Sequence, residues 1–299
     1  MRSTRYARRL LPQLQSGQTQ SSHPPTDRVP LAKPLILSPT LSPAAHALES
    51  QLVSNIVPGV LILDDDFASG DVVGVEALAR WSHLLHGVLS PADLLPAIEA
   101  CDELSRLVDA IMASAVKQAV AWKKHARRMP ISINRSLSVL GNRQFCKSAF
   151  ALVNAHGIAP QDLAFEILET AALTDVGRTL ETMTRLRLNG FGLAIDDFGT
   201  GFSSFEQLSS IPFTELKIDR SFVMGVATSP RQAAVVRSCV ELAHRLNLKV
   251  VAEGVETQSD WDFLVTAGAT EAQGYYLSRP MPGAAVAAWV DAWPERIQH

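Results

Sequence analysis

The chain has few cysteines, few aromatic residues and no surplus of positive charge. Its three cysteines, Cys101, Cys146 and Cys239, are odd in number and scattered, which argues against a disulfide framework and predicts a protein of the reducing cytoplasm. Lysine and arginine number 27 against 30 aspartate and glutamate residues, so no basic surface predicts binding to a nucleic-acid polymer. No apolar run is long enough for a signal peptide or a membrane span. These absences exclude several classes of protein and direct attention to local motifs.

Residues 1–47 differ in composition from the rest of the chain. They are rich in serine, glutamine, proline and arginine, and no acidic residue precedes Asp27. Such a segment cannot bury enough apolar surface to offset the entropy of ordering, so we expect a flexible tail. Hydrophobic residues make up 47% of the whole chain, which is enough for one large core. We therefore predict a single domain over residues 48–299.

Two adjacent carboxylates are the most informative feature of this domain. The apolar run 191–195 leads directly to Asp196 and Asp197, and a loop rich in glycine and hydroxyl groups follows at 199–204. Neighbouring side chains on a strand point to opposite faces, so both acids can serve one site only where the strand is ending. Hard cations such as Mg²⁺ take oxygen ligands and often share them with phosphate groups. The segment suggests metal-assisted phosphate chemistry, with a helix cap followed by a plain turn as the alternative.

The same order, an apolar run and then a polar side chain, recurs along the chain. It is found at Glu76, Asn134, Glu166, Lys217, Glu253 and Gln273. An acid at one strand end is often only a helix cap, but six successive segments of this kind predict that the strand ends meet at one centre.

Helical patterns separate these segments. Apolar residues recur at helical spacing over 104–115 and 233–246, and 178–188 and 259–267 are further candidates. Strands that alternate with helices predict an α/β protein with a parallel sheet, and its length fits a (β/α)₈ TIM-barrel-like fold. An open, doubly wound sheet is the alternative, although it would not gather ligands from so many strands.

The start of the domain departs from this parallel order. The apolar runs 60–63 and 72–75 are too close for a helical crossover, so this pair is predicted to be antiparallel. We interpret the intervening Asp64, Asp65 and Asp66 as part of a solvated turn rather than as a metal triplet.

Taken in order, these motifs resemble the bacterial EAL-domain cyclic-di-GMP phosphodiesterases from about residue 50 onward. The match rests on Glu76-Ala77-Leu78 with Arg80-Trp81, Asn134, Glu166 with Glu169, Asp196-Asp197-Phe198-Gly199, Lys217-Ile218-Asp219, Glu253-Gly254-Val255-Glu256 and Gln273-Gly274. The resemblance implies a (β/α)₈-like barrel with one antiparallel strand. It also implies hydrolysis of cyclic di-GMP to linear pGpG at a two-metal site that uses Mg²⁺ or Mn²⁺.

The resemblance also implies a role for each matching residue. The implied metal ligands are Glu76, Asn134, Glu166, Asp196 and Asp197, and the implied catalytic pair is Lys217 and Glu253. Leu78, Arg80 and Gln273 are expected at the substrate, and Glu169, Asp219 and Glu256 are expected to support the site and its loop. A lysine beside metal ions is expected to have a lowered pKa. How Lys217 and Glu253 divide the work is left open.

Three departures from the family pattern leave other functions open. The first strand lacks the usual glutamine, Leu168 replaces a threonine, and Arg135 follows Asn134 where a small or apolar residue is usual. The missing glutamine and Leu168 suggest the first alternative, a cyclic-di-GMP receptor or protein-interaction module with little turnover. A second is a metal-dependent barrel enzyme that acts on another phosphate ester. A homodimer formed through the barrel face and a regulatory protein partner are also expected from the resemblance.

Overall fold

The computed structural model describes residues 56–67, 69–83, 87–89, 104–124, 128–135, 143–169, 176–201, 208 and 210–293. The predicted tail, residues 1–47, and the first residues of the predicted domain lie outside this part of the chain. All described residues belong to one compact unit, Ser38–His299.

The elements alternate along the chain much as the sequence predicts. In order they are β1 (Ile56–Asp66), β2 (Val72–His83), β3 (Gly87–Leu89), α3 (Leu104–Lys123), β4 (Ile131–Arg135), α5 (Arg143–Ala155), η1 (Pro160–Asp162), β5 (Leu163–Leu168), α6 (Val176–Leu188), β6 (Gly192–Phe198), β7 (Glu215–Ile218), α8 (Arg220–Val223), η2 (Val226–Thr228), α9 (Pro230–Arg245), β8 (Lys249–Glu253), α10 (Gln258–Ala267), β9 (Glu271–Gln273), β10 (Met281–Pro282) and α11 (Gly283–Asp291).

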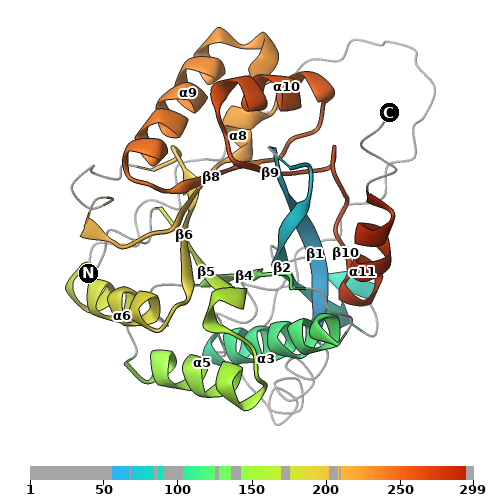
Figure 1. Ribbon diagram of the computed structural model, residues 1–299, viewed down its shortest axis with the longest axis vertical. Helices are drawn as coiled ribbons and strands as arrows, with labels where there is room; N and C mark the ends of the chain where they lie inside the picture. Colours follow the sequence, from blue (N-terminus) through green and yellow to red (C-terminus); the bar gives the residue numbers. More distant parts are fainter. Residues whose placement is uncertain are drawn as a thin grey trace, which may run out of the picture. The chain divides into compact units, whose positions relative to one another are not determined.

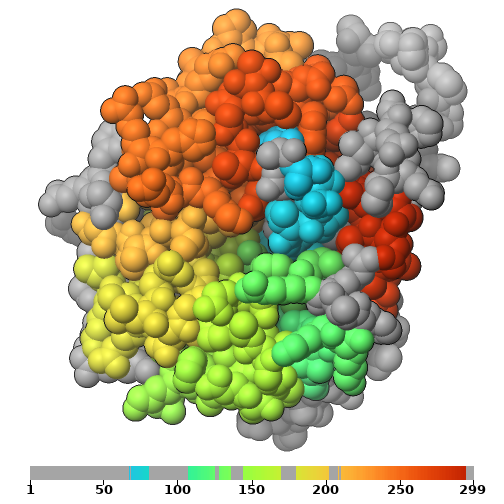
Figure 2. Space-filling view, in the orientation of Figure 1, coloured from blue at the N-terminus to red at the C-terminus, as the bar shows by residue number. Residues whose placement is uncertain are grey.

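Eight of the described strands close into a barrel. The pairing runs β1–β2–β4–β5–β6–β7–β8–β9 and returns to β1, so β1 completes the ring between β2 and β9. Figure 1 shows this ring with helices around its outside, and the opening that the ribbons leave is filled by atoms in Figure 2. A filled interior is expected of a barrel of this size, whose catalytic groups lie where the parallel strands end.

Strand β1 runs against its neighbours. It pairs antiparallel with both β2 and β9, whereas the pairs from β2–β4 through β8–β9 around the ring are parallel. The prediction of a turn at Asp64, Asp65 and Asp66 is wrong, because β1 extends through Asp66. Backbone pairing with β2 and β9 continues the strand there.

Alternation along each strand divides core residues from site residues. On β5, Leu163, Phe165 and Ile167 are fully buried beneath the helices, while Glu166 belongs to the opposite, inward face. The helices α3, α5 and α6 lie outside β4, β5 and β6 (Figure 1), and their apolar residues join those of the strands in one continuous core. None of the helices described here is both long and apolar enough to cross a membrane.

Arg135 is an exception within this core. Its side chain is only 4% exposed, and its guanidinium lies 4.7 Å from the ring centre of Phe145 and 5.5 Å from that of Phe165. None of its three side-chain nitrogens has a hydrogen-bond partner among the residues that the structure describes. Burial lowers the pKa of Arg135 to about 9, although the charge of Asp109 opposes the shift. The two rings offset only part of the cost of burying the charge.

Replacing this buried charge with an apolar side chain should therefore stabilise the protein. We expect Arg135→Met to raise the free energy of unfolding by about 1–4 kcal/mol, since it removes an incompletely compensated charge from the core. Denaturant unfolding would measure this. The control is Arg128→Met, which removes an exposed partner of Asp162 and should change the stability by less than about 1 kcal/mol. A less stable Arg135→Met variant would show that Arg135 has a compensating interaction.

Candidate active site

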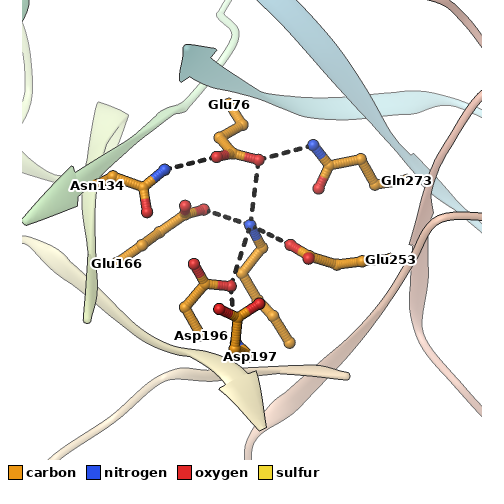
Figure 3. Close-up of polar contacts among 8 residues, drawn as sticks. Glu76, Asn134, Glu166, Asp196, Asp197, Glu253 and Gln273 are labelled. Atoms are coloured by element: carbon orange, nitrogen blue, oxygen red, sulfur yellow. Dashed lines mark hydrogen bonds and ion pairs between the residues drawn. The ribbon is translucent and has the colours of Figure 1, made fainter. Parts of the chain in front are cut away.

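A single lysine lies among carboxylates inside the barrel. The Nζ atom of Lys217, on β7, is 2.6 Å from Glu253 Oε1, 2.8 Å from Glu166 Oε1, 3.4 Å from Glu76 Oε2 and 4.0 Å from Asp196 Oδ1. Figure 3 shows these carboxylates converging from different strands. The structure thus brings together residues that are as much as 177 positions apart in the chain, from Glu76 to Glu253. We call the five carboxylates of Glu76, Glu166, Asp196, Asp197 and Glu253 the acid cage.

Glu76 is held from both sides by amide groups. Asn134 donates a hydrogen bond of 2.6 Å to Glu76 Oε1, and Gln273 donates one of 2.8 Å to Glu76 Oε2. From the sequence we expected Gln273 at the substrate and did not predict its hydrogen bond to Glu76. The structure places Gln273 at the end of β9, beside Glu253 in the register of β8 and β9.

Asp196 and Asp197 serve one site because the strand is irregular at this point. The pairing of β6 with β7 shifts register between Ile195 and Phe198, and Asp197 has a left-handed backbone with φ of 54°. Such a bulge turns a side chain that regular alternation would send to the opposite face. Oxygen atoms of Asp196, Asp197 and Glu253 consequently all lie within 4.8 Å of one another.

Glu169 fixes the loop that follows these two acids. Its Oε2 atom accepts hydrogen bonds from the backbone N–H groups of Gly199, at 3.0 Å, and Gly201, at 2.8 Å. Gly199 has a φ of 100°, and a β-carbon there would lie 2.9 Å from the ring of Phe222, so only glycine fits without strain. The role predicted for Glu169, holding the loop after Asp197, agrees with these contacts.

Burial, reinforced by neighbouring carboxylates, raises the pKa values of most of the cage. Burial, reinforced by Glu76, raises the pKa of Glu166 well above its usual range. Burial raises the pKa of Glu253 to about 8 even though Lys217 opposes the shift, and burial together with Asp196 and Asp219 raises the pKa of Asp197 to about 6. Glu76 differs: burial alone would raise its pKa, but Lys217 and the two amide donors lower it overall. The raised pKa values mean that the full ionisation of the cage is unfavourable with one ammonium as its counter-charge.

The surrounding carboxylates determine the pKa of Lys217 in this structure. Burial lowers the pKa, but Glu166, Glu253, Glu76 and Asp196 raise it more, so that it lies well above its usual range. Lys217 is accordingly a fixed positive charge in this arrangement. The lowered pKa expected from sequence concerns a lysine beside metal ions and stays a prediction.

The donor set fits divalent cations. Glu166 Oε2 is buried and accepts no hydrogen bond from any residue in the described part of the chain, and Gln273 Oε1 is equally unpartnered there. With every carboxylate ionised, five negative charges and the one positive charge of Lys217 would leave a net charge of minus four. Hard divalent cations bind oxygen ligands of this type, and two of them would balance that charge.

The positions of the remaining predicted site residues agree with their predicted roles to different degrees. Leu78 and Arg80 follow Glu76 at alternate positions on β2, and are therefore on the same face. Asp219 caps α8 by accepting a hydrogen bond from the backbone N–H of Ser221, and it also affects the pKa of Asp197. Glu256 is exposed, and no contact with Glu253 is recorded among the described residues, so the structure does not support the prediction that it braces Glu253.

Comparison with known proteins agrees with this geometry. The model of the EAL domain family matches residues 63–280, so the chain belongs to the EAL domain family. It is 38% identical over 217 residues to the cyclic di-GMP phosphodiesterase RocR of Pseudomonas aeruginosa, covering 71% of this chain and 54% of RocR. It is 37% identical over 240 residues to MucR of the same species, a bifunctional diguanylate cyclase and cyclic di-GMP phosphodiesterase, covering 79% of this chain and 34% of MucR.

Solved structures show the same fold. The phosphodiesterase PaMucR in complex with c-di-GMP superposes with a TM-score of 0.76 at 33% identity, covering 82% of this chain and all of that one. A manganese and c-di-GMP complex of BlrP1 from Klebsiella pneumoniae gives 0.68 at 29% identity, covering 77% of this chain and 57% of that one. The chain thus spans a third to about half of the length of RocR and MucR.

The arrangement predicts that Lys217 keeps the acid cage folded when no other cation is bound. Lys217→Met should lower the free energy of unfolding by about 3–5 kcal/mol in a chelating buffer, because it leaves buried carboxylates without their counter-charge. Adding Mn²⁺ should recover more stability in this variant than in the wild type. Thermal unfolding with and without Mn²⁺ would measure both effects, with Lys147→Met, at an exposed position on α5, as the control. Equal losses with and without Mn²⁺ would mean that Lys217 contributes packing alone.

Proposed function

We propose that this chain hydrolyses cyclic di-GMP to linear pGpG with the help of two divalent cations, Mg²⁺ or Mn²⁺. The observation that carries the proposal is the acid cage around Lys217, in which the predicted ligands and both predicted catalytic residues come together. The names of RocR and MucR as cyclic di-GMP phosphodiesterases support the choice of substrate.

The proposed metal ligands come from several strands. Glu76, Asn134, Glu166, Asp196 and Asp197 would hold the cations, and the amide of Asn134 provides an oxygen without adding charge. When bound, the cations would offset the charge of the phosphodiester and stabilise the attacking and leaving oxygens of an in-line displacement. The fixed β6 bulge and the amide donors to Glu76 position these side chains before the substrate arrives.

The different exposure of Lys217 and Glu253 supports a division of roles. The side chain of Glu253 is 18% exposed, whereas that of Lys217 is 2% exposed. Glu253 can therefore be reached by the attacking water and accepts its proton as the general base. Lys217, which is almost fully buried, would stabilise negative charge that develops on the phosphate.

Arg80 is the proposed phosphate-binding residue at the rim of the site. It is half-buried on β2, four residues after Glu76 and on the same face of the strand. In this structure its Nη1 atom donates a hydrogen bond of 2.8 Å to the carbonyl of Ala79, which leaves other donors of the guanidinium for a phosphate oxygen.

Removing the proposed base should abolish turnover while preserving the fold. We expect Glu253→Gln to lower kcat about 10²- to 10⁴-fold, because the carboxylate that accepts the proton is lost while the shape of the side chain is kept. Formation of pGpG from cyclic di-GMP and Mg²⁺ would be followed by chromatography. Glu241→Gln, on the exposed surface of α9, is the matched control and should retain full activity.

The same assay separates the alternative functions. No pGpG from folded protein that still binds cyclic di-GMP would contradict hydrolysis and leave a receptor. Equal hydrolysis of unrelated phosphodiesters would favour a less specific enzyme, and activity that survives chelation would contradict the role of the cations. The homodimer and the regulatory partner implied by the resemblance stay predictions.

A further inference from the structure

Leu168 is an exposed leucine that does not belong to the hydrophobic core. It is the last residue of β5 and is 43% exposed, although Phe165 and Ile167 of the same strand are fully buried. Because it lies two residues after Glu166, its side chain belongs to the inward face of the strand rather than to the helix-covered face. Leu168 therefore lies one step beyond Glu166 toward the open end of the barrel.

The backbone around Leu168 is fixed next to the acid cage. Leu168 is the register partner of Asp196 on β6, and the backbone N–H of the next residue, Glu169, donates a hydrogen bond of 2.9 Å to the carbonyl of Asp196. The Glu169 side chain in turn holds the loop that follows Asp197. An apolar side chain is thus held beside a predicted metal ligand by strand pairing and by a clamped loop.

We infer that Leu168 is a specificity-determining residue that contacts the sugar and base flanking the scissile phosphate. This rests on the proposed function, which places a phosphodiester at the acid cage. The groups next to such a phosphate are a ribose, with its C–H surface, and a guanine, with its flat face, and both can cover an exposed leucine. Covering this side chain removes apolar surface from water, so the contact favours binding.

The inference predicts a change in substrate binding without a change in the cage. Leu168→Ala should weaken binding of cyclic di-GMP on the order of tenfold, because the apolar contact is lost. Its KM should rise while kcat is retained, since the contact is the same in the ground state and the transition state. Affinity for Mn²⁺ and for inorganic phosphate should stay at the wild-type value.

Calorimetry with cyclic di-GMP on the Ca²⁺-loaded protein tests this, with Leu188→Ala as the matched control. Leu188 is 83% exposed at the end of α6, so its loss removes exposed leucine surface on a helix instead of at the barrel mouth. Weaker binding in Leu168→Ala alone would support the inference. Unchanged binding, or a parallel loss of Mn²⁺ affinity, would overturn it.

The test also separates this inference from the proposed function. If the wild type binds and cleaves cyclic di-GMP and Leu168→Ala does so equally well, only the role of Leu168 is wrong. If the wild type binds no cyclic di-GMP, the proposed function falls and the inference falls with it.

Discussion

The attraction between one buried ammonium and the surrounding carboxylates is the interaction on which the rest of the site depends. Lys217 lies within 4.0 Å of four carboxylates contributed by β2, β5, β6 and β8. Charges of one sign cannot be crowded inside a barrel unless a counter-charge accompanies them. Lys217 supplies that charge in part, and the cations of the proposed function would offset the charge of the remaining carboxylates.

The barrel makes this crowding structurally possible. Each parallel strand delivers one side chain at its end, and the irregularity of β6 delivers two, Asp196 and Asp197. The antiparallel strand β1 closes the ring between β2 and β9, and thereby brings Gln273 close enough to bind Glu76. The fold thus sets distances that no single motif encodes, and function follows from the shared location of the strand ends.

Much of this arrangement could be predicted because apolar runs that end in polar residues are local signals. They identified Glu76, Glu166, Asp196 and Lys217, and alternation with helices predicted the barrel. The bond between Gln273 and Glu76 depends on closure between β9 and β2 through β1, which no local pattern reveals. Asp64 to Asp66 have the composition of a turn, but strand pairing overrides it. The burial of Arg135 beside the rings of Phe145 and Phe165 could not be predicted either, because a charged residue in a sequence predicts exposure.

Two residues that depart from the family pattern, Leu168 and Arg135, lie near the cage but are not part of it. Leu168 is at the mouth, beside Asp196, and Arg135 is behind the barrel wall, next in sequence to Asn134. Leu168 places apolar surface where the substrate is expected, and Arg135 buries a charge where an apolar residue would fit. Residues near the cage can therefore vary while the cage residues stay the same.

The number of cations that the cage binds is the most direct measure of this account. A titration with Mn²⁺ followed by electron paramagnetic resonance should show two bound ions per wild-type chain, and Asp197→Asn should lose or weaken at least one of them, because Asp197 supplies one of the clustered oxygens. Absence of bound Mn²⁺ in the wild type, or identical binding in Asp197→Asn, would contradict the two-cation cage.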